Sequence, residues 1–261
     1  MSRSDTSNGG GGDIPVAVMT PPRVQSADDG QPGRRLQLLG ALAGITGPVL
    51  LAAYFTVPAL VGWPSAAESA GKLAGYATAH RLLFYFGGWL QATGALLSVV
   101  FLLVLLQRSG ARRTVAGAAT LTGCAVLLSV VLIEAAMLEA VPVAAANGDQ
   151  ATVATAFTLI NGVFVRIYPL APAPLVFAGI GFTLHRSGIL PQVFARTAVL
   201  ISGLFLIAGL AAVFGSAGLI FATVMSVVEA VWIPAAAIAF ARTMFTGPGD
   251  SPTAGQLGGE Q

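Results

Sequence analysis

Apolar residues in this chain form long runs separated by short polar stretches such as NGDQ at 147–150 and GSAG at 215–218. Each run exceeds the ~20 residues that a helix needs to cross a bilayer. We therefore predict an all-α fold, a polytopic membrane protein with a six-transmembrane-helix bundle and a disordered N-terminal tail. The six predicted spans cover residues 36–62, 82–107, 115–141, 152–184, 192–213 and 219–241.

The two ends of the chain lack an apolar period. Residues 1–34 are rich in Gly, Pro, Ser and Asp, which predicts a disordered tail, and residues 243–261 are interpreted in the same way. The pair Arg34-Arg35 is followed by an apolar run far longer than the h-region of a signal peptide, so we interpret that run as a retained anchor. The helical domain is then 35–242.

The connection between the first two spans, residues 63–81, is alanine-rich and holds Glu68 four residues before Lys72. This spacing supports a short helix on the outer surface. Aromatic residues favour the membrane interface, so we expect Trp63 and Tyr76 to lie at headgroup level.

Lysines and arginines are distributed unevenly between the two sides of the predicted bundle. With the N-terminus inside, the outer segments hold two of them, Lys72 and Arg81. The inner segments hold ten: Arg3, Arg23, Arg34, Arg35, Arg108, Arg112, Arg113, Arg186, Arg196 and Arg242. This positive-inside pattern predicts a multi-pass protein of the bacterial cytoplasmic membrane with both termini in the cytoplasm.

Composition supports the membrane assignment. Hydrophobic residues make up 55% of the 261 and charged residues only 9%, with a mean hydropathy of +0.80, whereas soluble domains carry about 25% charged residues. The formal charge of +2 and the scattered arginines exclude a nucleic-acid partner. The principal partner is the lipid bilayer, and the sequence indicates no particular oligomeric state.

Small residues at helical spacing predict where the spans pack, because lipid supplies no hydrophobic drive between helices. The candidate contact glycines are Gly40, Gly44, Gly87, Gly88, Gly203 and Gly209.

Arg166 lies in the middle of the fourth predicted span. A central arginine costs about 2.5–3.5 kcal/mol on insertion scales, and its guanidinium must therefore find carboxylates, carbonyls or water. At 1.5 Å per residue, Arg166 and Glu134 lie at similar heights, each about 30 Å from the nearest inner arginine. Glu229 is closer to the midplane but within reach of a long side chain.

These charges allow three interpretations. Arg166 is an ion-pair partner of Glu134 or Glu229 that fixes span four to its neighbours, or it is part of a wet, outward-facing cavity for a small polar or charged ligand. In the third, the span assignment is wrong and the charges lie in the headgroup region. The candidate ligand-binding or ion-pair residues are Arg166, Glu134, Glu229, Glu139, His80 and Arg81.

Three prolines follow Arg166 in the segment YPLAPAP. Pro169, Pro172 and Pro174 remove backbone donors and disfavour helix at the residues before them, so we predict a helix break. Broken helices form ligand sites in many transporters, and a simple kink is the alternative.

Spans three and six share a weak internal sequence similarity. Both place Ser-Val-Val before a Glu-Ala pair, and then a proline near three alanines. A true repeat of three spans would relate the two halves by inverted topology.

Motifs for catalysis and metal binding are missing. His80 and His185 are predicted on opposite sides of the membrane, and neither belongs to a metal-ligand spacing. The single cysteine, Cys124, cannot form an internal disulfide. We assign no catalytic residue, metal or cofactor, and an enzyme is the less favoured class.

The overall layout, a short basic-ended tail, six spans and charged third and fourth spans, resembles the uncharacterised six-span Ala/Gly-rich integral membrane proteins of high-GC bacteria that are filed under domains of unknown function. The resemblance covers residues 35–242 and implies a bacterial cytoplasmic membrane location. It carries over no activity and no functional residues.

Two functions follow from these observations. The first is a transporter-like or ligand-binding bundle with a polar intramembrane site near the outer half. The second is a non-catalytic membrane scaffold or accessory subunit, whose buried charges only lock helix packing.

Overall fold

A computed structural model describes residues 31–243, and every regular element in that range is helical. Six helical segments are long and apolar enough to cross a membrane, which indicates a multi-pass membrane protein. Five of the six spans are single helices: α1 (Gln31–Val61), α3 (Arg81–Arg108), α4 (Val115–Ala146), α8 (Gln192–Val213) and α9 (Ser216–Thr243). The fourth is assembled from α5 (Gln150–Thr158), a π-helix (Leu159–Phe164), α6 (Val165–Leu170) and α7 (Pro172–Ser187).

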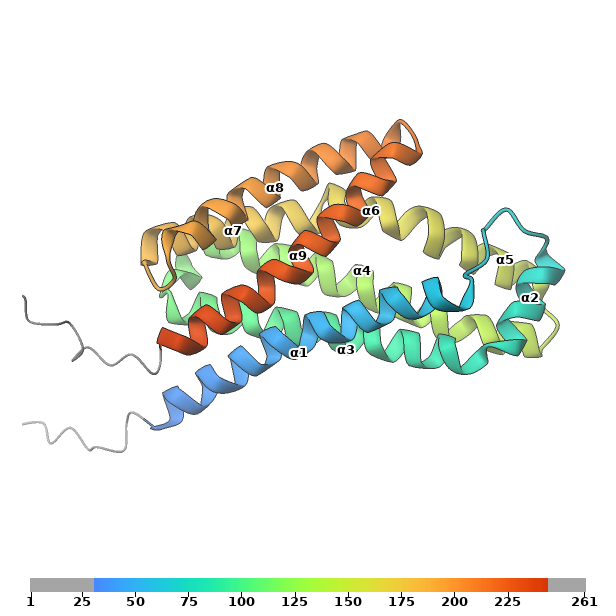
Figure 1. The fold of residues 1–261 in the computed structure, drawn as a ribbon, viewed down its shortest axis with the longest axis horizontal. Coiled ribbons are helices and arrows are strands. Elements are labelled where there is room, and N and C mark those ends of the chain that lie inside the picture. The colour runs from blue at the N-terminus through green and yellow to red at the C-terminus, as the bar shows by residue number, and fades with distance from the viewer. Residues whose placement is uncertain (1–30, 244–261) are drawn as a thin grey trace, which may run out of the picture.

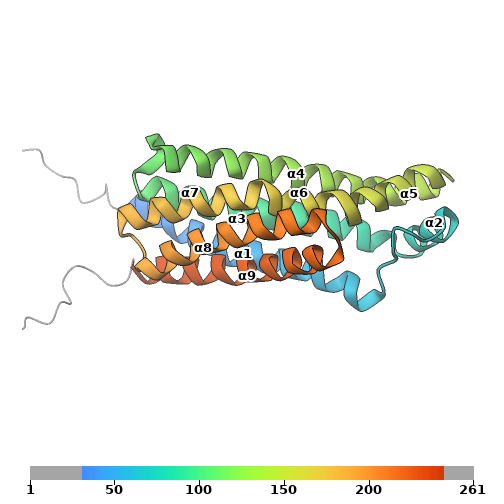
Figure 2. The same cartoon turned by 90° about the horizontal axis from the view of Figure 1, so that it is seen from above.

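The six spans form an elongated bundle in which chain neighbours are also neighbours in space. α1 packs on α3, α3 on α4, α4 on α7, α7 on α8 and α8 on α9, and α9 returns to α1. Figures 1 and 2 show both ends of the described chain at one end of the bundle, here named the terminal end. α2 (Ala70–Ala79) and α5 lie at the opposite end, here named the cap end.

This ring order excludes the inverted repeat that the sequence similarity of spans three and six suggested. A two-fold axis in the membrane plane reverses the direction in which the chain runs around a ring of helices. Here the chain proceeds around the ring in one direction from α1 to α9. The similarity of spans three and six is therefore one of composition and not of symmetry.

The predicted tail boundary needs a correction. α1 begins at Gln31, so residues 31–34 are helical and not part of a tail, and α9 extends to Thr243. The rest of the two predicted tails, 1–30 and 244–261, lies outside the described residues.

Side-chain caps and left-handed glycines set the helix ends. The Thr114 hydroxyl accepts from the Gly117 N–H at 3.0 Å and begins α4. Asp149 accepts from the Thr152 N–H at 3.0 Å and begins α5. Gly188, with φ 63°, ends α7 in the left-handed conformation that glycine adopts at little cost.

Glycines allow the backbones of α1 and α3 to touch. A Cβ on Gly47 would lie 2.6 Å from the Gly94 carbonyl oxygen, and one on Gly94 would lie 2.8 Å from that of Gly47. Atoms of a neighbouring helix lie within 4 Å of an added Cβ at five of the six predicted glycines, which confirms Gly40, Gly44, Gly87, Gly88 and Gly209. Gly203 has no neighbour within 4 Å of such a Cβ, so that prediction was wrong.

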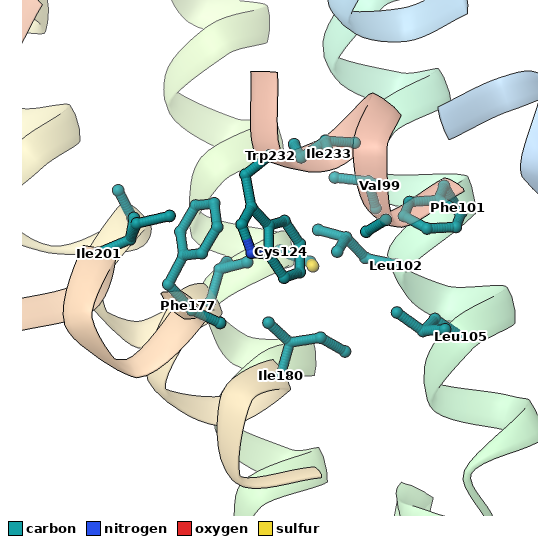
Figure 3. Close-up of a cluster of buried hydrophobic side chains, with 14 of the residues drawn as sticks. Val99, Phe101, Leu102, Leu105, Cys124, Phe177, Ile180, Ile201, Trp232 and Ile233 are labelled. Atoms are coloured by element: carbon teal, nitrogen blue, oxygen red, sulfur yellow. The ribbon is translucent and has the colours of Figure 1, made fainter. Parts of the chain in front are cut away.

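The centre of the bundle is filled with side chains. Figure 3 shows the Trp232 indole projecting from α9 beside Phe177 and Cys124. The ring centroids of Phe177 and Trp232 are 5.3 Å apart, and the indole N–H donates to the Thr197 hydroxyl at 2.9 Å. At this level the core is packed rather than open.

A second cluster of buried residues lies at the cap end, where α2 and α5 cover the ends of α1, α3 and α4. Trp63 packs against the rings of Tyr76, Phe84 and Phe157 at centroid distances of 5.3–6.0 Å. The short helix predicted within residues 63–81 is confirmed as α2. Trp63 and Tyr76 pack against this second cluster of buried residues. They were expected at headgroup level, and the structure adds a packing role.

Candidate functional site

The fourth span is broken where the prolines predicted a break. α6 ends at Leu170, Ala171 adopts φ −126° and ψ −66°, and α7 begins with Pro172. Proline suits the first turn of a helix because the N–H that it lacks has no partner there. Pro169 lies inside α6 and Pro174 in the first turn of α7.

Neighbouring helix α8 packs directly on this break. A Cβ on Gly209 would lie 2.8 Å from Cα of Leu170, so only glycine admits the backbone this closely. About two helical turns before Gly209 on α8, the Ser202 hydroxyl donates to the Pro174 carbonyl at 2.7 Å. Broken backbone at membrane depth is tolerated where protein buries it, and these contacts supply that burial.

Arg166 binds backbone carbonyls. Its guanidinium donates to the carbonyl oxygens of Gly162 and, from Nε at 3.4 Å, of Ala212. Ala212 is among the last four residues of α8, whose carbonyls lack partners within the helix. The side chain is exposed. Arg166 therefore caps the C-terminus of α8, where a cation also complements the helix dipole.

The predicted ion pair needs a correction. Within residues 31–243, the salt bridge that forms joins Lys72 to Glu68 at 3.1 Å. The structure does not pair Arg166 with Glu134 or with Glu229. The physical reason is that the end of α8 lies beside Arg166 and offers carbonyl acceptors there.

Glu229 on α9 is held by a tyrosine. The hydroxyl of Tyr168, on α6, donates to Glu229 Oε2. The Tyr168 ring packs edge-on against Phe205 of α8, with centroids 5.7 Å apart. The hydroxyl and the carboxyl satisfy each other inside a packed contact among three helices.

Glu134 on α4 lies in a different polar cluster. Its carboxyl interacts with the side chains of Gln91 on α3 and Tyr54 on α1. Gln91 is only 3% exposed, and its Oε1 atom has no hydrogen-bond partner. An unsatisfied buried polar atom costs about 1–3 kcal/mol. The group of Tyr54, Gln91 and Glu134, here named the α1–α3–α4 cluster, therefore contains a buried acceptor without a hydrogen-bond partner among the described residues.

A small hollow adjoins this cluster on its cap side. Its volume is ≈ 70 Å³, and apolar and aromatic side chains dominate its walls. Gly87 lies one turn from Gln91 on α3, and Leu138 lies one turn from Glu134 on α4. The lining residues are Tyr54, Trp63, Leu83, Phe86, Gly87, Leu90 and Leu138.

The remaining predicted site residues lie apart from these clusters. Glu139 lines a wide, open hollow of ≈ 570 Å³ between α3, α4 and α5, together with Asn147 and Asp149. His80 stacks on Tyr76 with centroids 4.3 Å apart, and Arg81 is the exposed first residue of α3. The six predicted residues thus occupy separate places and do not form one site.

Among the loop residues, Asp149 has a shifted acidity. The hydroxyl and the N–H of Thr152 both donate to its carboxylate, and these hydrogen bonds lower the pKa of Asp149. Hydrogen bonds to a charged form favour that form. The group acts as the cap of α5.

Tyr54, Gln91 and Tyr168 are the site residues that the sequence analysis missed. Gln91 is an amide in the middle of an apolar run, and polar side chains within spans mark functional positions. That signal was available for Gln91. Tyrosines are common at membrane interfaces, so neither Tyr54 nor Tyr168 could be singled out by residue type.

Comparisons with protein-family models, with curated proteins and with solved structures found no match. Within the described part of the chain, no group of three or more His, Cys, Asp or Glu residues could hold a metal ion. The candidate site therefore rests on the α1–α3–α4 cluster and its hollow.

Proposed function

We propose that this chain is a transporter-like, ligand-binding protein of the bacterial cytoplasmic membrane, and that the α1–α3–α4 cluster binds a small polar or charged ligand. The arginines outside the spans support an orientation with both termini in the cytoplasm. Except for Arg81, the arginines outside the spans in the described helices and turns lie at the terminal end. Arg81 and Lys72 lie toward the cap end. The cluster then lies in the outer half of the bundle.

One observation carries the proposal: among the described residues, the carboxyl of Glu134, in a candidate membrane span, has no basic partner and lies beside a buried amide oxygen without a donor. Ionisable groups inside membranes are costly and mark ligand or ion pathways. Buried polar atoms in native structures almost always have a partner. A ligand that supplies a donor at this place satisfies both groups.

The structural alternative, a scaffold whose charges lock helices, is favoured by other contacts. Arg166 caps α8, and Tyr168 closes over Glu229. Both arrangements join two helices through hydrogen bonds. They support a packing role for these residues and leave the α1–α3–α4 cluster as the candidate for binding.

The test is thermal unfolding of the full-length protein in nanodiscs against a panel of small amines, carboxylates and neutral polyols. We expect one class to stabilise the wild type and to lose its effect in Glu134→Gln. Glu139→Gln is the matched control, because it changes the same side chain on the same helix at the open hollow. If no class stabilises the wild type, or if Glu134→Gln responds as the wild type does, the scaffold function replaces the proposal.

A further inference from the structure

The α1–α3–α4 cluster and its hollow together specify a class of ligand. We infer that the site takes a small primary alkylammonium ion, with its nitrogen at Gln91 and Glu134 and its alkyl chain in the hollow. This inference rests on the proposed function and adds the chemistry of the ligand to it.

The polar part of the site is rich in acceptors. The unpartnered Oε1 of Gln91 can only accept, and the carboxyl of Glu134 accepts when ionised. Within the part of the chain that the structure describes, no basic side chain forms a salt bridge with Glu134. A primary ammonium has three N–H donors and one positive charge. It therefore complements both groups, whereas an anion would be repelled by Glu134.

The hollow selects an apolar chain. The aromatic rings of Tyr54, Trp63 and Phe86 form part of its walls, and the other lining residues are aliphatic or glycine. Such walls do not satisfy the hydroxyls of a sugar or the water shell of a metal ion. Aromatic faces also attract organic cations, which lowers the cost of placing an ammonium nearby.

The size of the hollow limits the chain length. Each water-sized group needs about 10–15 Å³, so ≈ 70 Å³ holds about five to seven such groups, which is enough for the four carbons of a butyl chain. The hollow is offset by one helical turn from the polar groups, because Gly87 precedes Gln91 by four residues and Leu138 follows Glu134 by four. Four residues rise about 6 Å, which matches the length of n-butylammonium, an ion of one nitrogen and four carbons.

Isothermal calorimetry of the full-length protein in nanodiscs tests this inference with n-butylammonium chloride as the probe. Butyrate reverses the charge, n-butanol removes it, and tetramethylammonium keeps the charge and heavy-atom number but has no N–H. We expect binding of n-butylammonium at least ~10-fold tighter than that of the other three, since a hydrogen bond to a charged group changes affinity by about 10–100-fold.

Two variants locate the two ends of the ligand. Gln91→Leu should weaken n-butylammonium binding about 10-fold, because it removes the acceptor. Gly87→Ala should fold normally, since its added Cβ would lie 3.5 Å from the Tyr54 ring, an ordinary contact. Because that methyl shortens the hollow, Gly87→Ala should shift the preference from n-butylammonium to ethylammonium.

The outcomes separate this inference from the function on which it rests. If another class of ligand binds in a Glu134-dependent manner and n-butylammonium does not, the alkylammonium inference is overturned and the proposed function stands. Equal binding of tetramethylammonium or n-butanol also overturns it, because the acceptors then play no role. If the stability difference between the wild type and Glu134→Gln depends on pH but not on any added ligand, a proton on the carboxyl satisfies the cluster and the inference fails. If nothing binds, both proposals fall.

Discussion

Two glutamates within the candidate membrane spans contact tyrosines, yet their surroundings differ. Glu134 lies on the third span and meets Tyr54 of the first, whereas Glu229 lies on the sixth and meets Tyr168 of the fourth. The Tyr168 hydroxyl satisfies Glu229, and Phe205 packs on the tyrosine ring. At Glu134, the additional Gln91 brings an acceptor that remains unsatisfied, and a hollow adjoins. In the function that we propose, these surroundings leave Glu229 to packing and Glu134 to the ligand.

This difference has a structural origin in the break of the fourth span. The break at Ala171 lets α6 carry Tyr168 toward α9, and α8 presses on it through Gly209. On the other side of the ring, α1 and α3 approach through Gly47 and Gly94 and continue as unbroken helices. One cluster depends on the break, and the other depends on regular helix packing.

Gly209→Ala should disturb the Glu229 side most strongly. The added methyl would lie 2.8–3.0 Å from backbone atoms of Pro169 and Leu170, so α6 and α8 must move apart and Tyr168 moves with them. Overpacking of this kind costs about 1–3 kcal/mol, partly offset by up to ~1 kcal/mol of helix propensity. Thermal unfolding in nanodiscs should show a clear drop in Tm.

Gly203→Ala is the control on the same helix. No atom lies within 4 Å of its added Cβ, so only the gain in helix propensity remains and Tm should hold or rise slightly. n-Butylammonium binding should survive in both variants, since the α1–α3–α4 cluster does not touch α8. Equal Tm values for the two variants would show that the close approach at the break carries no energy.

Tyr168→Phe and Tyr54→Phe compare the two tyrosines directly. Tyr168→Phe removes the donor that holds Glu229, and side-chain hydrogen bonds between membrane helices contribute about 0.6–1.7 kcal/mol. Tyr54→Phe leaves Glu134 its contact with Gln91, so we expect a smaller loss of stability. The unfolding of both variants in the same nanodiscs measures the difference.

For ligand affinity, the order of the two variants should be reversed: Tyr54→Phe should lose more than Tyr168→Phe. Tyr54→Phe alters the wall of the hollow and the partner of Glu134, so it should weaken n-butylammonium binding. Tyr168→Phe should leave that affinity unchanged. Reversal of this order would assign the binding role to Glu229 and the packing role to Glu134.

The fold could be predicted from the sequence to a large extent because its signals are long and local. Six apolar runs predict six spans, and the prolines of YPLAPAP predict the break between α6 and α7. The glycine contacts were harder, since spacing alone cannot show which face of a helix meets a neighbour. Gly209 packs on the break while Gly203, six residues earlier on the same helix, faces open space.

The candidate site could be predicted only in part. Charge and depth singled out Glu134, Glu229 and Arg166, but depth does not say which helices are neighbours. The ring order places α3 between α1 and α4, and it places α8 beside α6. That arrangement gives Glu134 the partners Tyr54 and Gln91, and it gives Arg166 the carbonyl of Ala212.

Arg166→Ala should have only a small effect on stability, although its charge is the most conspicuous in the spans. It removes a cation from the C-terminus of α8, which corresponds to about 0.3–1 kcal/mol for an exposed group. Arg81→Ala is the control, because Arg81 is also exposed but begins a helix, where a cation gains nothing from the dipole. Tm should fall slightly in the first variant and hold in the second, and n-butylammonium binding should persist in both. Loss of ligand binding in Arg166→Ala alone would place the guanidinium in the site, and the ligand would then have to offer an acceptor for it as well as a donor for Gln91.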